Sequence, residues 1–578
     1  MAEVMPVVPD RVLRVAARQP AQPAIIDGDR IVSYERLADV AKSLGQRLRA
    51  AGAGPETVVA LYLHRSIELV TAALATLLSG AAYLCLDPTQ PAARNRYMAE
   101  DSNALLVLTD RRAWRGDLET AAKVVYLDDP GQAGDAIGGG DTAVAGDMLA
   151  YVNYTSGSSG APKGVLVEHG GLANLVAWYG DYYQVKPGDV MTQLARQTFD
   201  ALALEIWPCL GNGATLRIVP SALLEDPDAL AAWFRQAGVT VSFVPTPLAE
   251  EMLAASFSSP GGRLPLRAML VGGDRLHRYP PSGLPFRVFN NYGPTECTVV
   301  AVCCEVTANP DAAEAPPIGK PIPGTKAHVL DEELRPVPDG EPGMLYLAGA
   351  GVARGYLGEA DGSSFLPDMA DPGGRMYATG DIVRAAGDGT LFFLGRGDSQ
   401  LKISGIRIEP AEVEAALLRC GPVRQAAVVG HRPAPGAPEV LVGYVVSDAD
   451  DGPALRLKLA EELPGYLVPA VIVRVGSMPT DAHGKLDRKE LSGRRLDTAP
   501  ARPGPGDVLS PALSKVWCEV LGLESANPDG DFFELGGDSL RIIRLVSRAR
   551  ASGITLQPED VHRHPVLTDL AQAISQNG

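Results

Sequence analysis

One short segment of the chain combines the residue types that bind phosphate groups. The apolar run LAYVNY (149–154) has the pattern of a buried strand, and small or hydroxylated residues follow it directly. Glycines let backbone N–H groups approach phosphate oxygens, hydroxyls add donors, and a lysine supplies positive charge. The residues predicted to contact phosphate are Thr155, Ser156, Gly157, Ser158, Ser159, Gly160 and Lys163.

A linker and a Walker A loop both fit this segment less well. A flexible Gly/Ser linker would not follow a buried strand or end in Pro-Lys-Gly. A Walker A loop closes with Gly-Lys-Ser or Gly-Lys-Thr, which is absent, and Pro162 stands where its helix would start. The segment therefore predicts a phosphate-binding loop of another type.

A second chemical feature is the sequence GDFFELGGDSLRIIRL (530–545). Ser539 stands where a glycine-containing loop gives way to a helical pattern, so its hydroxyl is expected at a helix N-terminus. A phosphodiester at that place gains from the helix dipole and from free backbone amides. An ordinary N-cap serine is the alternative interpretation.

The elements that must position these residues fall into three predicted domains. Residues 1–397 alternate helical stretches such as YERLADVAKSLGQRLRAAG with short apolar strands, which indicates an α/β body with largely parallel sheets. Residues 398–496 have the pattern of a small α+β domain. The Pro-containing segment 497–507 is predicted to be a linker. Residues 508–578 are predicted to form a helical bundle, since their apolar residues follow helical spacing.

Composition excludes several classes of protein. The chain has 578 residues, 46% hydrophobic and 21% charged, which excludes a wholly disordered protein. A net charge of −17 argues against nucleic-acid binding. Seven scattered cysteines without a CxxC pair argue against a disulfide framework and a zinc site. No signal peptide is recognised, so a cytoplasmic location is expected. The uncharged stretch 69–86 is predicted to be a buried helix, a glycine break and a strand, and no membrane segment is expected.

The segment YTSGSSGAPKG (154–164) resembles the phosphate loop of the adenylate-forming superfamily, which includes acyl- and aryl-CoA ligases and luciferases. The resemblance is strongest to the adenylation domains of nonribosomal peptide synthetases and extends over about residues 10 to 495. Further motifs occur in the order of that family: VSYERL (32–37), LLSGAAYLCLDP (77–88), QTFDAL (197–202), NNYGPTE (290–296), GVARGYL (351–357), YATGD (377–381), GRGDSQLKISGIRIEPAEVE (395–414), LPGYLVP (463–469) and HGKLDRKEL (483–491).

The resemblance implies an ATP site with Mg²⁺. Thr295 would contact a phosphate, Glu296 would help to hold Mg²⁺, and Tyr292 would stack near adenine. Asp381 would accept hydrogen bonds from the ribose. The other residues implied in nucleotide binding are Gly272, Gly273, Asp274, Asn291, Gly293, Arg396 and Lys485. The chain departs from the common pattern at Ser159, Ala378, Ser404 and His483.

The resemblance also implies how the reaction is divided in time. Lys485 matches the catalytic lysine, whose ammonium would stabilise the charge that builds up as a carboxylate attacks the α-phosphate. Asp398 matches the hinge about which the small domain rotates, removing Lys485 before the second step. The tail resembles a peptidyl carrier domain, an all-α four-helix bundle, and Ser539 would bear 4′-phosphopantetheine.

Transfer of the family's substrate-pocket positions predicts an α-amino acid substrate. Asp200 would pair with its ammonium group and Lys485 would reach its carboxylate. The full set is Asp200, Ala201, Leu204, Phe243, Leu270, Gly272, Asn291, Val299, Val300 and Lys485. Apart from Asn291 the side-chain lining is apolar, so a charged substrate side chain would lack a partner. The set resembles that of leucine-activating domains, with Leu204 in place of a common tryptophan. Valine, isoleucine, methionine and phenylalanine stay open.

The sequence therefore predicts an enzyme that forms an aminoacyl-adenylate and loads the aminoacyl group on its own carrier domain. The expected partners are a phosphopantetheinyl transferase and a downstream condensation or tailoring enzyme. A small MbtH-like helper protein is left open. No condensation or thioesterase segment is recognised, so a free-standing loading protein is expected. The alternatives are a coenzyme A ligase and a non-catalytic carrier or docking protein.

Overall fold

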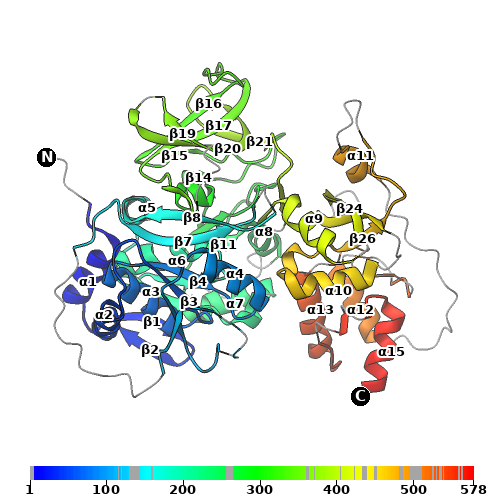
Figure 1. The fold of residues 1–578 in the computed structure, drawn as a ribbon, viewed down its shortest axis with the longest axis horizontal. Coiled ribbons are helices and arrows are strands. Elements are labelled where there is room, and N and C mark those ends of the chain that lie inside the picture. Colours follow the sequence, from blue (N-terminus) through cyan, green and yellow to red (C-terminus); the bar gives the residue numbers. More distant parts are fainter. Residues whose placement is uncertain are drawn as a thin grey trace. The chain divides into compact units, whose positions relative to one another are not determined.

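A computed structural model describes the chain between residues 5 and 577 with internal gaps (Figure 1). Outside the described part lie residues 1–4, 115, 117, 119, 129–142, 158–159, 225, 256–263, 359–363, 370, 404, 422, 433–438, 448–451, 481–485, 495–510, 522, 524–525, 529, 533–534, 536, 538, 558–559, 562–563 and 578. The chain divides into two compact units. The first comprises residues 1–155 and 162–399, and the second comprises residues 156–161 and 400–578.

The first unit contains a nine-stranded sheet that supplies most of the predicted pocket positions. Its order is β15-β14-β13-β12-β11-β9-β10-β1-β2, and the pairs from β13 to β1 are parallel. The strands are β1 (Pro23–Asp27), β2 (Arg30–Ser33), β9 (Val190–Gln193), β10 (Thr215–Ile218), β11 (Val241–Pro245), β12 (Ala268–Gly272), β13 (Arg287–Tyr292), β14 (Val302–Val306) and β15 (Lys320–Pro321). Parallel strands put their carboxyl ends at one edge, where open α/β sheets place their ligand sites.

A seven-stranded sheet of order β18-β8-β7-β4-β3-β5-β6 forms a second layer of the first unit. Its strands are β3 (Val58–Tyr62), β4 (Ala82–Leu86), β5 (Leu106–Thr109), β6 (Lys123–Tyr126), β7 (Leu149–Thr155), β8 (Lys163–Glu168) and β18 (Gly355–Tyr356). Strands β3 and β4 are buried throughout, as expected for parallel strands covered on both faces.

The helices of the first unit pack on these two sheets. They are α1 (Val8–Arg18), α2 (Tyr34–Ala50), α3 (Ile67–Ser79), α4 (Ala92–Asp101), α5 (His169–Tyr182), α6 (Ala201–Gly211), α7 (Pro227–Ala237) and α8 (Thr246–Ala255). Helices α1, α2, α3, α5 and α6 share one hydrophobic core with strands of both sheets. The uncharged stretch 69–86 is buried α3, Gly80 in a left-handed cap, and β4, as predicted. Within the described part of the chain, no helix is long and apolar enough to cross a bilayer.

The region 325–396 differs from the predicted alternation of helices and strands. It forms a five-stranded antiparallel sheet of β16 (Thr325–Leu330), β17 (Pro342–Gly349), β19 (Phe365–Asp368), β20 (Asp371–Ala385) and β21 (Leu391–Arg396), drawn in green in Figure 1. Several of its connections are too short for a parallel crossover, which needs about a dozen residues or more. A hairpin turn at Gly389 joins β20 to β21, and its φ of 81° suits glycine.

The second unit contains the small domain and the carrier region. Its elements are β22 (Leu401–Ile403), β23 (Ile406–Ile408), α9 (Pro410–Arg419), β24 (Val423–His431), β25 (Val440–Ser447), α10 (Gly452–Glu462), β26 (Val471–Arg474), α11 (Arg488–Gly493), α12 (Pro511–Leu521), α13 (Ser539–Ala551) and α15 (Leu567–Asn577). The apolar residues at helical spacing between 513 and 521 form the buried face of α12. On this face the Trp517 ring packs edge-on against Phe532, with 5.1 Å between the ring centres. The predicted linker 497–507 lies outside the described residues.

Candidate functional site

The turn after β13 brings two predicted site residues into contact. Thr295 opens a single 3₁₀ turn (Thr295–Cys297), and its Oγ1 donates to Oδ2 of Asp200 at 2.8 Å. Asp200 directly precedes α6, so the contact joins two segments 95 residues apart. A predicted phosphate contact and a predicted ammonium partner therefore lie side by side.

Glu296, the predicted metal ligand, is fully buried, and its partner is a residue of the motif GVARGYL (351–357) to which no role was assigned. The hydroxyl of Tyr356 donates to its Oε1 at 2.8 Å. The ammonium of Lys163 lies 5.3 Å from the centre of the Tyr356 ring, a cation–π distance. Strand β18, which carries Tyr356, pairs with β8 beside Lys163. One tyrosine thus joins the predicted phosphate-loop lysine to the predicted metal ligand.

Asp381 is buried and receives two hydrogen bonds through its two carboxylate oxygens. Arg396 Nη1 donates to Oδ1 at 2.6 Å, and the Tyr292 hydroxyl donates to Oδ2. Burial, reinforced by the charge of Asp381, raises the pKa of Tyr292 well above its usual value, so the phenol stays a donor at neutral pH. Carboxylate oxygens can accept further hydrogen bonds, so the predicted ribose contact is compatible with this arrangement.

Arg396 also links Asp381 to the predicted hinge residue Asp398. Its Nε and Nη2 donate to the two oxygens of Asp398 at 2.8 and 2.6 Å. Gly380 has a φ of 75°, and a Cβ there would lie 2.6 Å from atoms of both Arg396 and Asp398. The positive φ favours glycine, and a Cβ would force this pair of side chains to shift. The two units divide after Ser399, one residue beyond Asp398.

The backbone that follows Glu296 is strained at two successive residues. Thr298 and Val299 have φ values of 53° and 69°, and a β-branched residue in this region is a true outlier. The turn is fixed because Thr298 Oγ1 donates to the Gly351 carbonyl at 2.6 Å. A Cβ on Gly293 would lie 2.5 Å from the Val299 carbonyl oxygen. Such strain persists only where the surroundings hold it, and it is concentrated at functional sites.

The predicted pocket positions come from neighbouring strands and from α6. Phe243 pairs with Leu270 across β11 and β12, and Gly272 pairs with Asn291 across β12 and β13. A Cβ on Gly272 would lie 2.7 Å from the Asn291 carbonyl oxygen and 3.2 Å from the Phe243 ring. The buried members that share one hydrophobic core are Leu204, Phe243, Leu270, Val299 and Val300, with Ala201 packed against it.

Two further predicted nucleotide-binding residues follow β12. Gly273 has a φ of 85°, and the Asp274 carboxylate accepts from the Arg275 N–H at 2.7 Å. The hydroxyl of Thr246 hydrogen-bonds to the carbonyl oxygens of Gly272 and Asp274, at 3.0 and 3.1 Å. This segment is therefore a fixed turn at the end of a central strand.

The predicted phosphate loop begins and ends on paired strands. Thr155 of β7 pairs with Lys163 of β8, so the loop is closed at its base. Within the second unit, Ser156 Oγ donates to the Arg407 carbonyl at 3.0 Å and accepts from the Glu409 N–H at 3.2 Å. A Cβ on Gly160 would lie 3.0 Å from the Ala415 Cβ, and Gly157 accepts a backbone hydrogen bond from Gly160.

Several predicted site residues lie outside the described part of the chain. They are Ser158, Ser159 and Lys485, together with the departures Ser404 and His483. The backbone of Ser539 is described and begins the 13-residue helix α13, as predicted, but its side chain is not. The roles of these residues stay predictions.

Glu205 on α6 holds the loop that leads to Asp200, and no sequence motif indicated it. Its two carboxylate oxygens accept from the N–H groups of Leu194 and Ala195, each at 2.9 Å. Burial raises the pKa of Glu205 to about 8, although the two N–H groups and the Arg65 charge act in the opposite direction. Helix α6, which Asp200 directly precedes, is thereby tied to the end of β9.

Glu205 is expected to make stability depend on pH. Its pKa in the folded protein lies above the unfolded value, so its contribution is complete below about pH 4.5 and is lost as pH rises through about 8. We expect the wild-type unfolding temperature to fall across that window more steeply than that of Glu205→Gln. Thermal unfolding from about pH 5 to about pH 9 measures both slopes. Equal slopes would contradict the assignment.

Comparison with protein families gives three matches along the chain. The family described as AMP-binding enzyme matches residues 12–357, and its C-terminal domain family matches residues 412–485. A phosphopantetheine attachment site family matches residues 511–574. Together these matches cover both described units.

Known proteins are similar over nearly the whole chain. Linear gramicidin synthase subunits C and B of Brevibacillus parabrevis are 38% and 39% identical, over 98% and 97% of this chain. The chain spans only 7% and 11% of the length of these two relatives. A solved structure of holo-PA1221, an NRPS protein containing adenylation and PCP domains, bound to a vinylsulfonamide inhibitor, is 28% identical, with a TM-score of 0.79. That similarity covers 99% of this chain and 97% of the other.

Proposed function

The chain belongs to the family of AMP-binding enzymes, and from this membership we propose that it activates a hydrophobic amino acid and loads it on its own carrier domain. The predicted family and fold class are confirmed: an adenylate-forming body, a small C-terminal domain and a helical carrier. The same matches confirm the predicted cofactors, which are ATP with Mg²⁺ and covalently attached 4′-phosphopantetheine.

The contact between Thr295 and Asp200 carries the proposal. Asp200 is suited to the ammonium of an amino acid, and Thr295 is suited to a phosphate oxygen. In an α-amino acid a single carbon separates the ammonium from the carboxylate. A substrate whose ammonium binds Asp200 would therefore hold its carboxylate next to a phosphate that binds Thr295. Such proximity converts a bimolecular attack into an effectively unimolecular one.

Glu296 is suited to Mg²⁺ on the chemistry of its surroundings. Mg²⁺ is usually held by one or two carboxylates together with substrate phosphates and waters. Within the described residues no group of three or more His, Cys, Asp or Glu side chains could hold a metal. A single buried carboxylate, oriented by Tyr356, matches a cation that takes its other ligands from ATP and water. Bound there, Mg²⁺ would neutralise charge on the phosphates.

The first step joins the amino acid to the nucleotide. A carboxylate oxygen attacks the α-phosphorus, the bond to the β-phosphate oxygen breaks, and pyrophosphate leaves with that electron pair. Lys163 would balance phosphate charge, and Lys485 would act at the reacting oxygens. Asp381, held by Arg396 and Tyr292, would accept from the ribose.

The second step transfers the aminoacyl group to a thiol. A 4′-phosphopantetheine thiol on Ser539 would supply the nucleophile. As the carbon–sulfur bond forms, the acyl carbon–oxygen bond of the mixed anhydride would break, AMP would leave with that electron pair, and the thiol proton would pass to solvent. In this structure the Asp398 carboxylate is hydrogen-bonded to Arg396. Rotation of the small domain about Asp398 would exchange the arrangement for adenylation for the arrangement for transfer to the thiol. A phosphopantetheinyl transferase must act first, because the attachment site needs its modification.

Leucine is the proposed substrate. Its support is the apolar character of the shared core formed by Leu204, Phe243, Leu270, Val299 and Val300. Valine, isoleucine, methionine and phenylalanine are the neighbouring candidates, since one methylene changes selectivity by only about 1–3 kcal/mol. A downstream condensation or tailoring enzyme would receive the product, and an MbtH-like protein is proposed as a helper.

Amino-acid-dependent exchange of pyrophosphate into ATP tests the first step of this function. Leucine should give the highest kcat/KM among the common amino acids, and charged amino acids should give none above background. Exchange with a carboxylic acid that lacks an ammonium group, together with transfer of its acyl group to free coenzyme A in a separate assay, would instead identify a CoA ligase. Absence of exchange with every amino acid, in the presence of an MbtH-like protein, would contradict the proposal.

A further inference from the structure

Asn291 is the polar member of the predicted side-chain pocket, and its amide is already engaged by the protein. Its Oδ1 accepts from the hydroxyl of Tyr183 at 2.5 Å. Its Nδ2 lies 3.4 Å from the carbonyl oxygens of Val271 and Phe289. The residue is only 5% exposed. Each end of the amide therefore has a partner in the protein.

The direction of this hydrogen bond follows from the chemistry of its two groups. An amide oxygen can only accept, so Tyr183 must donate. Burial, reinforced by Cys303, raises the pKa of Tyr183 well above its usual value, so the phenol keeps its proton. Burial likewise raises the pKa of Cys303 to about 12, and its thiol lies 3.2 Å from the Tyr183 hydroxyl. The Cys303 thiol, the Tyr183 phenol and the Asn291 amide oxygen thus form a row of uncharged, hydrogen-bonded groups.

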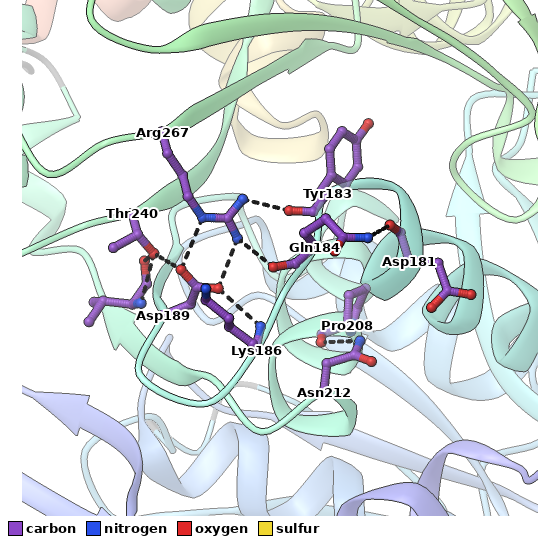
Figure 2. Close-up of polar contacts among 10 residues, drawn as sticks. Asp181, Tyr183, Gln184, Lys186, Asp189, Pro208, Asn212, Thr240 and Arg267 are labelled. Atoms are coloured by element: carbon purple, nitrogen blue, oxygen red, sulfur yellow. Dashed lines mark hydrogen bonds and ion pairs between the residues drawn. The ribbon is translucent and has the colours of Figure 1, made fainter.

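Tyr183 is held in this orientation from two sides. Its ring packs edge-on against Tyr179 and Phe289, at 4.6 and 5.0 Å between ring centres. Its backbone carbonyl accepts from Arg267 at 2.5 Å, as Figure 2 shows. Arg267 is itself fixed by two hydrogen bonds, of 3.1 and 2.8 Å, to the two oxygens of Asp189. The tyrosine is therefore a rigid donor.

The Asp189 carboxylate, which holds Arg267, is charged at neutral pH. Burial alone would raise the pKa of Asp189, but hydrogen bonds from Arg267 and Thr240 outweigh burial and lower it. Thr240 donates to Oδ1 of Asp189 at 2.7 Å, and the Lys186 N–H donates to Oδ2 at 3.0 Å (Figure 2). The turn that follows Tyr183 is thus fixed by a fully hydrogen-bonded ion pair.

We propose that Tyr183 is a specificity-determining residue that fixes the Asn291 amide and fills one of the two acceptor positions of its oxygen, so that a polar substrate side chain gains little from Asn291. A substrate side chain with a hydroxyl or amide would then lose its hydrogen bonds to water and would have to compete with Tyr183 for the Asn291 oxygen. An apolar side chain of the same shape loses nothing. This inference rests on the proposed function, and it explains how a pocket that contains an asparagine can select an apolar amino acid.

The test compares substrates of equal shape. Valine and threonine are one such pair, and leucine and asparagine are another. In Tyr183→Phe the Asn291 oxygen is free to accept, so the ratio of kcat/KM for valine over threonine in pyrophosphate exchange should fall by about tenfold, the value of one hydrogen bond. Tyr34→Phe is the matched control, because it also removes a buried phenol hydroxyl, one that donates to the Ala214 carbonyl, whereas the bond to Asn291 comes from Tyr183. Its ratio should equal that of wild type.

A second variant separates the effect of the Tyr183–Asn291 hydrogen bond from a general loss of packing. In Asn291→Leu the oxygen is absent, so adding Tyr183→Phe should leave the valine-to-threonine ratio unchanged. An unchanged ratio in Tyr183→Phe alone would overturn the proposal, as would an equal fall in the double variant. If Tyr183→Phe does not fold, the Asn291→Leu variant alone decides. If Asn291 hydrogen-bonds to the substrate side chain, this variant changes the valine-to-threonine ratio. If Tyr183 already holds the Asn291 oxygen, the ratio stays the same. Wild-type protein without exchange activity would instead contradict the proposed function.

Discussion

The Ser539→Ala variant is expected to form aminoacyl-AMP as wild type does and to carry no amino acid. Its missing hydroxyl is the predicted attachment point of 4′-phosphopantetheine, so no thiol is available to attack the adenylate. The adenylating residues lie mainly in the first unit, far from Ser539 in sequence, and alanine is well tolerated in helices. Pyrophosphate exchange measures the first activity, and intact protein mass measures the second.

Ser552→Ala is the matched control for this prediction. Ser552 is an exposed carrier serine just after α13, and its loss should leave both pantetheinylation and loading intact. If loading persisted in Ser539→Ala, the attachment point of 4′-phosphopantetheine would be another residue. Loss of pyrophosphate exchange in Ser539→Ala would show that the serine also contributes to adenylation. That result would contradict the proposal that the carrier serine acts only in the transfer step.

The Lys485→Ala variant is expected to lose adenylation while retaining transfer. Removing one group that stabilises developing negative charge lowers a rate by about 10²–10³-fold. The effect should fall on kcat for pyrophosphate exchange, because the lysine is proposed to act in that transition state. Loading from chemically supplied aminoacyl-AMP bypasses this step, so its rate should be near that of wild type.

Lys489→Ala is the control for the lysine prediction. Lys489 is an exposed residue of α11, four positions beyond Lys485, and its replacement should change neither half-reaction. If Lys485→Ala slowed both half-reactions equally, the lysine would be acting in substrate binding or in folding. If it slowed neither, the assigned role would be wrong.

Local patterns in the sequence predicted much of the fold. Residues 69–86 were resolved into a helix, a glycine break and a strand because an uncharged run with a central glycine fits two buried elements. The apolar spacing in α12 predicted its buried face. These features depend on neighbouring residues alone. The antiparallel sheet of β16, β17, β19, β20 and β21 was not predicted, because its strand pairing depends on connections rather than on local periodicity.

Long-range side-chain pairs were the part of the site that local patterns could not predict. Tyr183 and Asn291 are 108 residues apart, and Tyr292 and Asp381 are 89 apart. Motif resemblance assigned a role to Tyr292 and Asp381 separately, without their hydrogen bond. Tyr183 lies outside the motifs that carry the family resemblance, and its aromatic neighbours resemble an ordinary core. Only the three-dimensional arrangement distinguishes it.

Intact-mass analysis of the pantetheinylated protein tests the central claim most directly. The protein is incubated with ATP, Mg²⁺ and single amino acids, with ATP omitted in a parallel sample. We predict a mass increase equal to one leucine residue that requires ATP, is reversed by hydroxylamine, and is absent from Ser539→Ala. No amino-acid-dependent increase with any amino acid, or an increase that persists in Ser539→Ala, would contradict the account.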